Sequence, residues 1–375
     1  MKWLTFVLLI YALSSCIVSL ENDHELNEDI LVVEGFIDND FGPHEIKVTY
    51  LAQFAGILEG GEVRRVEASV AIVDEFGNRT DLIRESGTIR YLAADVGLQS
   101  CTPIFKSRDF QTNYLTPATF RGEPGVAYLI EIADDRTGKM YRSSFTRMPQ
   151  PISLDSILFE FKSFPSADED ASISGVDVFA NWTDPAESGN HYWWEMEGTY
   201  KLETPQLAGQ TCCVYDQSDE FGTRCWKVER AINGSLAPLS DEDFNGRNTI
   251  EKVGFIEDDG LRFSSDAVPG EKQYHLKVSQ YAISEAAYEY LIKMRTLSEI
   301  DGEIFDPPPV TLVSNVYNLD DPEEVVVGYF GVYSKGTLST FMNRNVLLER
   351  KKHRLCGDCR HFQFQGQIEI PDVYR

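Results

Sequence analysis

The alternation of hydrophobic and polar positions in the first 150 residues is typical of short strands. Residues 44–50, for example, place polar and apolar side chains in turn, and clusters of Asp, Asn, Gly and Pro separate such segments. We expect strands at 30–37, 44–50, 66–73, 80–83, 128–132 and 140–145. Because no helical pattern lies between them, the sequence predicts a β-sandwich over residues 30–148.

The segment Met148-Pro149-Gln150-Pro151 predicts a domain boundary, since closely spaced prolines stiffen a connection and remove the backbone donors that a sheet needs. Beyond it we expect strands at 152–159, 175–182, 191–200, 261–263, 274–279, 315–318 and 325–333. The second domain, 149–375, is therefore also expected to be β-rich. The chain as a whole is predicted to be mainly β, with two sandwich domains of the immunoglobulin or fibronectin kind.

One helix is predicted within the second domain. Ser284 can cap residues 285–300, in which Ala287, Leu291 and Met294 recur on one face. The run of prolines after Asp306 prevents the helix from continuing.

The N-terminus has the layout of an export signal. Lys2 precedes an apolar run at 3–13, which is too short to cross a bilayer because a span needs roughly 20 residues. The following Leu-Ser-Ser-Cys resembles the lipobox of bacterial lipoproteins, in which the cysteine thiol receives a diacylglycerol. We expect residues 1–15 to be removed and Cys16 to hold the chain to membrane lipid; the alternative is a plain signal peptide with a chance cysteine.

Residues 16–29 carry acidic side chains and no hydrophobic period, so they predict a flexible tether. The whole chain has 60 Asp and Glu against 34 Lys and Arg, a formal charge of -26. Such a charge repels phosphate backbones, which disfavours nucleic-acid binding.

Six further cysteines are an even set, which in an exported chain predicts disulfides. Candidates are Cys212, Cys213, Cys225, Cys356 and Cys359, with Cys101 as the remaining member. A zinc site built from the Cys356–Cys359 pair and a second pair is the alternative, because the spacing of the first pair suits metal ligation.

Catalytic signatures are absent from the sequence: there is no metalloprotease helix motif, phosphate loop or nucleophile elbow. Glu195 and Glu197 would share one face of a strand, which suits glycoside chemistry but equally a solvated acidic face. Residues 241–246 match the start of a calcium loop, yet Lys252 occupies its twelfth position. We therefore predict no catalytic residues, no cofactor and no metal.

Three neighbouring aromatic residues, Tyr192, Trp193 and Trp194, are candidates for ligand binding. Successive strand residues face opposite ways, so at least one of them faces away from the core and can stack on a sugar or peptide. The alternative is that one tryptophan lies in the core and the other packs under a loop.

Several ordered motifs together carry a family resemblance. They are Leu31-Val32-Val33-Glu34-Gly35, the helix after Ser284, Phe305-Asp306-Pro307-Pro308-Pro309, Asn315, Asp321-Pro322-Glu323-Glu324, Gly328-Tyr329-Phe330-Gly331 and Cys356-Gly357-Asp358-Cys359-Arg360. The chain resembles a family of Bacteroidota outer-membrane lipoproteins that carries an uncharacterised-domain label and is usually encoded beside TonB-dependent receptors. The resemblance implies a lipid-anchored protein at the outer membrane, facing the cell exterior, whose partner is a TonB-dependent receptor barrel.

Three functions follow as hypotheses. The first is an accessory, ligand-capturing lipoprotein of a nutrient uptake system. The second is a structural or assembly partner in an envelope complex, and the third is an extracellular hydrolase. The sequence favours the first and predicts that the protein is not an enzyme.

Overall fold

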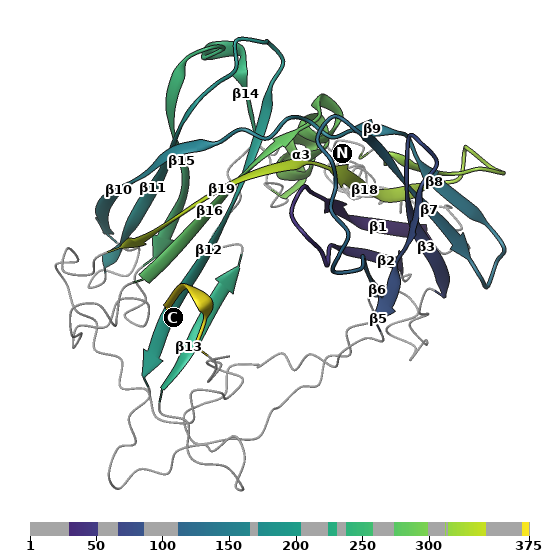
Figure 1. Cartoon of the computed structure of the whole chain (residues 1–375), viewed down its shortest axis with the longest axis horizontal. Helices are drawn as coiled ribbons and strands as arrows, with labels where there is room; N and C mark the ends of the chain where they lie inside the picture. The colour runs from purple at the N-terminus through teal and green to yellow at the C-terminus, as the bar shows by residue number, and fades with distance from the viewer. Residues whose placement is uncertain are drawn as a thin grey trace, which may run out of the picture.

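The computed structural model describes residues 30–51, 67–85, 112–165, 172–203, 224–230, 238–257, 274–298, 312, 314–342 and 370–374. Within these ranges the chain is mainly β and folds into two β-sandwich modules that lie side by side (Figure 1). The predicted fold class is therefore confirmed. The predicted strand at 261–263 and the predicted signal and tether lie outside the described residues.

The first module packs two sheets face to face. One sheet has the order β18-β1-β2-β6-β5 and the other β17-β8-β7-β3-β4, with β9 paired to β7. The strands are β1 (Ile30–Ile37), β2 (Glu45–Leu51), β3 (Ala68–Asp74), β4 (Arg79–Asp81), β5 (Ile83–Glu85), β6 (Thr112–Leu115), β7 (Ala127–Asp134), β8 (Met140–Ser143), β9 (Thr146–Arg147), β17 (Val316–Asn318) and β18 (Val326–Val332). Alternate residues such as Leu31, Val33, Ile46 and Val48 face the shared core, as the two-residue period requires.

The chain leaves the first module near the boundary predicted at residue 148, between β9 and β10, but it returns later, because β17 and β18 belong to the sheets of the first module. β18 runs parallel to β1, with Leu31 opposite Val326 and Ile37 opposite Val332. The two backbones meet closely at Gly328, whose φ is +96° and where a Cβ atom would lie 2.0 Å from Val33 O. No turn joins two strands that are so distant in sequence. The hydrophobic pattern therefore could not predict that β1 and β18 pair.

The second module also packs two sheets. Their orders are β10-β11-β15 and β13-β12-β16-β19, with β14 paired to β12. The strands are β10 (Leu154–Pro165), β11 (Ser172–Thr183), β12 (His191–Glu203), β13 (Arg224–Arg230), β14 (Leu239–Ser240), β15 (Asn248–Glu257), β16 (Tyr274–Ile283) and β19 (Ser334–Met342). Trp182, Tyr192 and Trp194 pack together at the centre of this core.

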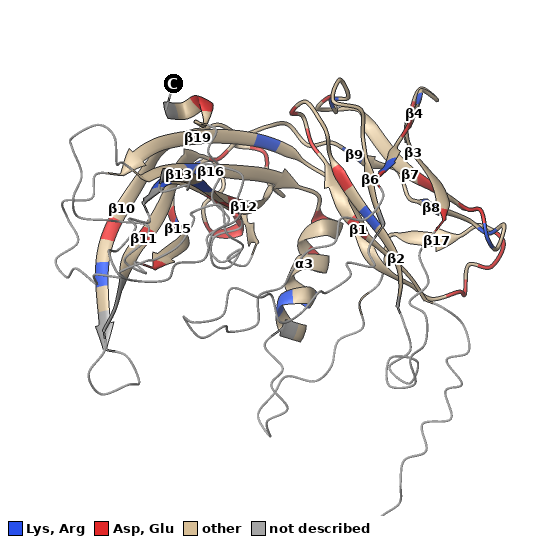
Figure 2. Ribbon diagram, turned by 90° about the horizontal axis from the view of Figure 1, so that it is seen from below, with Lys and Arg blue, Asp and Glu red and all other residues tan. Residues whose placement is uncertain are grey.

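The predicted helix is observed as α3 (Glu285–Ser298), which lies where the modules meet (Figure 2). Ser284 caps it, because Ser284 Oγ accepts a hydrogen bond of 3.2 Å from Ala287 N. Tyr290 of α3 stacks on Tyr329 of β18, with ring centroids 4.8 Å apart. The chain passes from β18 to β19 through Tyr333 alone, so the helix and this crossing fix one module against the other.

Candidate functional site

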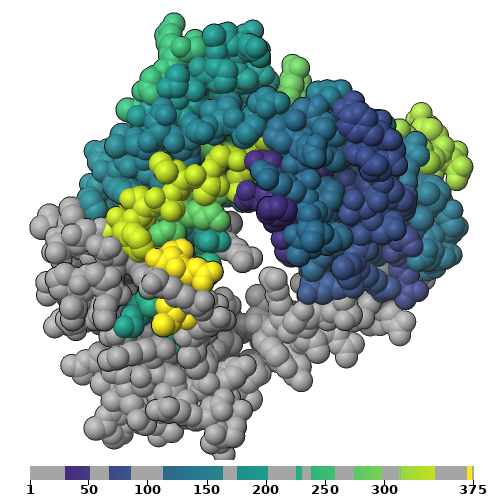
Figure 3. Space-filling view, viewed as in Figure 1, coloured from purple at the N-terminus to yellow at the C-terminus, as the bar shows by residue number. Residues whose placement is uncertain are grey.

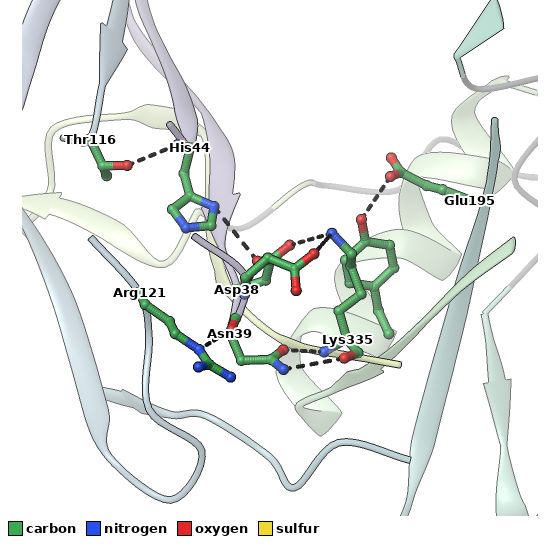
Figure 4. A network of polar contacts seen from close by, with 9 residues as sticks. Asp38, Asn39, His44, Thr116, Arg121, Glu195 and Lys335 are labelled. Carbon is green, nitrogen blue, oxygen red and sulfur yellow. Dashed lines mark hydrogen bonds and ion pairs between the residues drawn. The ribbon is translucent and has the colours of Figure 1, made fainter. Parts of the chain in front are cut away.

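A polar network forms where the turn after β1 meets the start of β19 (Figure 4). Asp38 and Asp40 lie in the turn that follows β1 in the first module, and Lys335 is the second residue of β19 in the second module. Lys335 Nζ lies 3.4 Å from Asp38 Oδ2 and 2.5 Å from Asp40 Oδ2. The ammonium is also 5.9 Å from the ring centroid of Tyr281. One cation from the second module is thus enclosed by carboxylates of the first.

Backbone contacts hold this turn in place. Asn39 Nδ2 donates to Lys335 O over 3.2 Å, and Lys335 N donates back to Asn39 Oδ1. Arg121 Nε donates to Asn39 O over 2.6 Å. The turn is therefore bonded both to the second module and to the loop that precedes β7, which makes the network preorganised.

His44 lies at the first-module side of the network. Its Nδ1 is 3.8 Å from Asp38 Oδ1, and its backbone N donates to Thr116 Oγ1 over 2.8 Å. Burial lowers the pKa of His44, and this effect outweighs the opposite influence of Asp38. The imidazole is therefore neutral at pH 7.

Glu195 of β12 faces the network from the second module. Tyr281 Oη donates to Glu195 Oε2 over 2.9 Å. Burial raises the pKa of the Glu195 carboxyl, although the Tyr281 hydroxyl and Lys335 act in the opposite direction. The Glu195 carboxyl, held by the Tyr281 hydroxyl, can therefore exchange hydrogen bonds with a polar group of a ligand.

A cavity of 650 Å³, which we call the junction hollow, opens beside these residues. Figure 3 shows the molecule hollowed between β19 and the β1–β2 hairpin. Its charged lining consists of the carboxylates of Glu34, Asp38, Asp40, Glu45 and Glu195, the amines of Lys47 and Lys335, and His44. Acidic groups exceed basic ones, so the hollow favours ligands with positive charge.

A second cavity of 410 Å³, which we call the loop hollow, lies among the loops at the same end of the first module. Phe76, Phe120 and Tyr128 supply aromatic surface, and Asp74, Arg121 and Glu123 supply charge. Arg121 connects the two hollows, because its guanidinium lies 5.5 Å from the ring centroid of Phe41, which lines the junction hollow.

The three aromatic candidates on β12 have different positions. Tyr192 and Trp194 are 0% and 2% exposed inside the second core, so neither can stack on a ligand, and this part of the prediction is corrected. Trp193 faces the other way and packs between Phe36 and Tyr281, with centroid distances of 6.1 and 5.1 Å. The alternation was predicted correctly, but the face opposite the core is covered by the first module.

Of the cysteines, only Cys225 is within the described residues, where it is buried on β13. Cys16, Cys101, Cys212, Cys213, Cys356 and Cys359 lie outside them, so lipidation and the disulfide pairing stay predictions.

The calcium-like segment begins with a buried Asp241 in a short 3-10 helix. Its carboxylate accepts hydrogen bonds from the backbone N of Gly189 and Asn190, at 3.1 and 3.0 Å. These contacts give Asp241 a structural role in the turn before β12. In the described part of the chain, no group of three or more His, Cys, Asp and Glu could hold a metal ion.

Reasoning from the sequence missed the polar network. Asp38, Asn39 and Asp40 were identified only as a turn, and nothing near Lys335 in the sequence indicates a buried ammonium. The one available signal was a lysine two residues after the strongly apolar 325–333 segment, since burying a lysine requires a counter-charge.

Comparison with known proteins gives a family but no characterised relative. No curated protein matches the chain. Among the helices of the described residues, none combines the length and the apolar character that crossing a bilayer requires. The model of the family described as domain of unknown function (DUF4249) matches residues 18–339, which is most of the sequence, and the chain therefore belongs to this family.

Proposed function

We propose that this protein is a lipid-anchored lipoprotein of the outer membrane that captures a ligand for a TonB-dependent nutrient uptake system. The observation that carries the proposal is the Leu13-Ser14-Ser15-Cys16 motif at the end of a short apolar run. Several acyl chains on one residue give stable anchoring, whereas one chain alone is marginal. The resemblance to Bacteroidota lipoproteins encoded beside TonB-dependent receptors supplies the partner and the membrane.

The junction hollow supports a capturing role. Its volume of 650 Å³ lies in the range of about 300–1,000 Å³ typical of small-ligand sites. Its walls come from both modules, and their relative position is fixed by the bonds between Asn39 and Lys335. A site preformed in this way binds without a large ordering cost.

The anchor is tested by fractionation of cells that express the full chain or its Cys16→Ser variant. We expect the unaltered protein in the outer membrane with an acylated N-terminal cysteine by mass spectrometry, and the variant in the soluble fraction. Ser19→Ala is the matched control, because it changes a neighbouring residue and leaves the motif intact. Firm membrane attachment of Cys16→Ser would refute the anchoring part.

The uptake role is tested by affinity purification from detergent-solubilised outer membranes. A transporter barrel recovered in stoichiometric amount supports capture for uptake. Recovery with secretion or adhesion machinery instead would support the alternative role of an assembly partner and overturn the proposal.

A further inference from the structure

The loop end of the first module carries the two most exposed phenylalanines of the described residues. Phe41 follows β1 and is 68% exposed, and Phe76 follows β3 and is 73% exposed. A large aromatic side chain in water loses the benefit of burial, so two such residues at one end of a module indicate a surface that a partner covers.

The two phenylalanines belong to one continuous surface, which we call the loop-end surface. It comprises the junction hollow, Phe41, Arg121, the loop hollow and Phe76. Phe41 lies under the Arg121 guanidinium, and Arg121 and Phe76 line the same hollow. Figure 4 shows Arg121 beside Asn39, to whose backbone oxygen it is bonded.

The loops of this surface are held together before any partner binds. Gly42 N donates to Phe120 O over 2.8 Å, and Gly122 N donates to Asp38 O over 3.0 Å. With the bond from Arg121 to Asn39 O, these contacts tie the turn after β1 to the loop that precedes β7. A preorganised surface loses little freedom on binding.

The charge of the surface is acidic. Both hollows contain more carboxylates than cations, and Glu34 and Glu45 are exposed and form no ion pair with any other described residue. Lys335 demonstrates that the hollow accommodates an ammonium, because its Nζ lies between Asp38 and Asp40 and near the Tyr281 ring. A complementary partner therefore carries positive charge.

From these observations we infer that the loop-end surface docks a protein segment in which lysine or arginine alternates with apolar side chains. The apolar side chains cover Phe41 and Phe76, and the cations meet the free carboxylates of Glu34 and Glu45. The inference rests on the proposed function, for which it supplies the surface that meets the transporter.

A synthetic peptide tests this chemistry without a known partner. A short fluorescein-labelled peptide of alternating Lys and Leu is titrated with the protein and followed by anisotropy, and a peptide of alternating Glu and Leu serves as its control. We expect saturable binding of the Lys peptide, weakened by added salt, and no binding of the Glu peptide. Equal binding of both peptides would overturn the proposal.

Variants locate the binding. Phe41→Ala with Phe76→Ala should weaken binding of the Lys peptide about tenfold or more, because exposed aromatic anchors dominate such interfaces. Ile83→Ala with Val325→Ala is the matched control, since both residues are 62% exposed and neither lines a hollow. The role of charge is tested with the double variant Glu34→Gln, Glu45→Gln, whose affinity for the Lys peptide should fall. Its control is the double variant Glu85→Gln, Glu289→Gln, which changes the net charge equally.

Loss of affinity in the surface variants alone supports the proposal, and an equal effect in surface and control variants refutes it. The same variants separate this proposal from the proposed function. A transporter that co-purifies equally with the unaltered protein and the Phe41→Ala, Phe76→Ala variant would refute the docking surface and leave the uptake role intact. Selective binding of the Lys peptide, with no transporter recovered in the purification, would refute the uptake role and leave the docking surface intact.

Discussion

Replacing Lys335 by Met tests whether the network between the modules stabilises the fold. The substitution preserves much of the side-chain volume and removes the charge that Asp38 and Asp40 share. The Asp38 side chain is 6% exposed and that of Lys335 12%, so the variant leaves a buried carboxylate without its counter-charge. Removing one partner of a buried pair costs about 3–5 kcal/mol, and partial access to water places our expectation at about 3 kcal/mol.

Asp40→Asn provides the contrast. The Asp40 side chain is 55% exposed, and pairs with a solvated partner contribute about 0–1 kcal/mol. Urea unfolding followed by tryptophan fluorescence measures both variants against the unaltered chain. We expect a large loss of unfolding free energy for Lys335→Met and a small one for Asp40→Asn.

A double variant checks the cause. Combining Asp38→Asn with Lys335→Met removes the uncompensated charge, so it should be more stable than Lys335→Met alone. The reasoning fails if Lys335→Met unfolds within about 1 kcal/mol of the unaltered chain, because a pair worth so little behaves as a solvated one. It also fails if the double variant regains nothing.

The remaining predictions concern protonation and backbone geometry. Because burial lowers the pKa of His44 below its unfolded value of 6.5, the unfolded state binds the proton more readily, and stability falls as pH drops below about 6.5. His44→Gln should therefore lose less stability than the unaltered chain between neutral and mildly acidic pH. If the unfolding free energy, measured with urea, falls equally with pH in both proteins, this prediction is contradicted. Glu324 accepts from Lys139 Nζ at 2.9 Å, Tyr141 Oη at 2.8 Å and Asn318 Nδ2 at 2.6 Å. Burial alone would raise its pKa, but these donors lower it, so its stabilisation is present above pH 4.5 and is lost as pH falls through the lowered pKa. Glu324→Gln should lower the unfolding free energy by about 1–3 kcal/mol at pH 7 and by progressively less in acid. A difference between variant and unaltered chain that stays the same at every pH would refute a stabilising role of the ionised Glu324 carboxylate. Gly328→Ala should destabilise by more than about 2 kcal/mol, since it combines a positive φ with a clash against Val33. Gly77 has a φ of +85° and nothing within 4 Å of an added Cβ atom, so Gly77→Ala measures the cost of the backbone conformation alone, about 1 kcal/mol. Equal decreases of the melting temperature in the Gly328→Ala and Gly77→Ala variants would show that the clash with Val33 is relieved.

Local pattern predicted the local structure of this chain well. The strand expected at 30–37 is β1, and the helix expected at 285–300 is α3, because alternation and capping are decided by near neighbours. The pairing of β1 with β18 depends on residues almost 300 positions apart and leaves no local signature.

The candidate site was predictable only in part. Glu195 was identified as a carboxylate on an outward strand face, but its partner Tyr281 and the cation Lys335 come from other strands. Trp193 was one of three candidates for ligand binding, with packing against a neighbouring segment as the alternative, and it packs against Phe36. Which surfaces remain open depends on how the modules pack, and a pattern read along one strand carries no information on that.

The parallel partnership of β1 with β18 also bears on how the protein matures. Synthesis from the N-terminus produces β1 long before residues 326–332 have been made. Until they arrive, one border of that sheet lacks its neighbour, and contacts of such long sequence separation form slowly. The first module thus stays incomplete until nearly the whole chain has been made, and a polypeptide cut short before residue 326 leaves a strand border open to self-association.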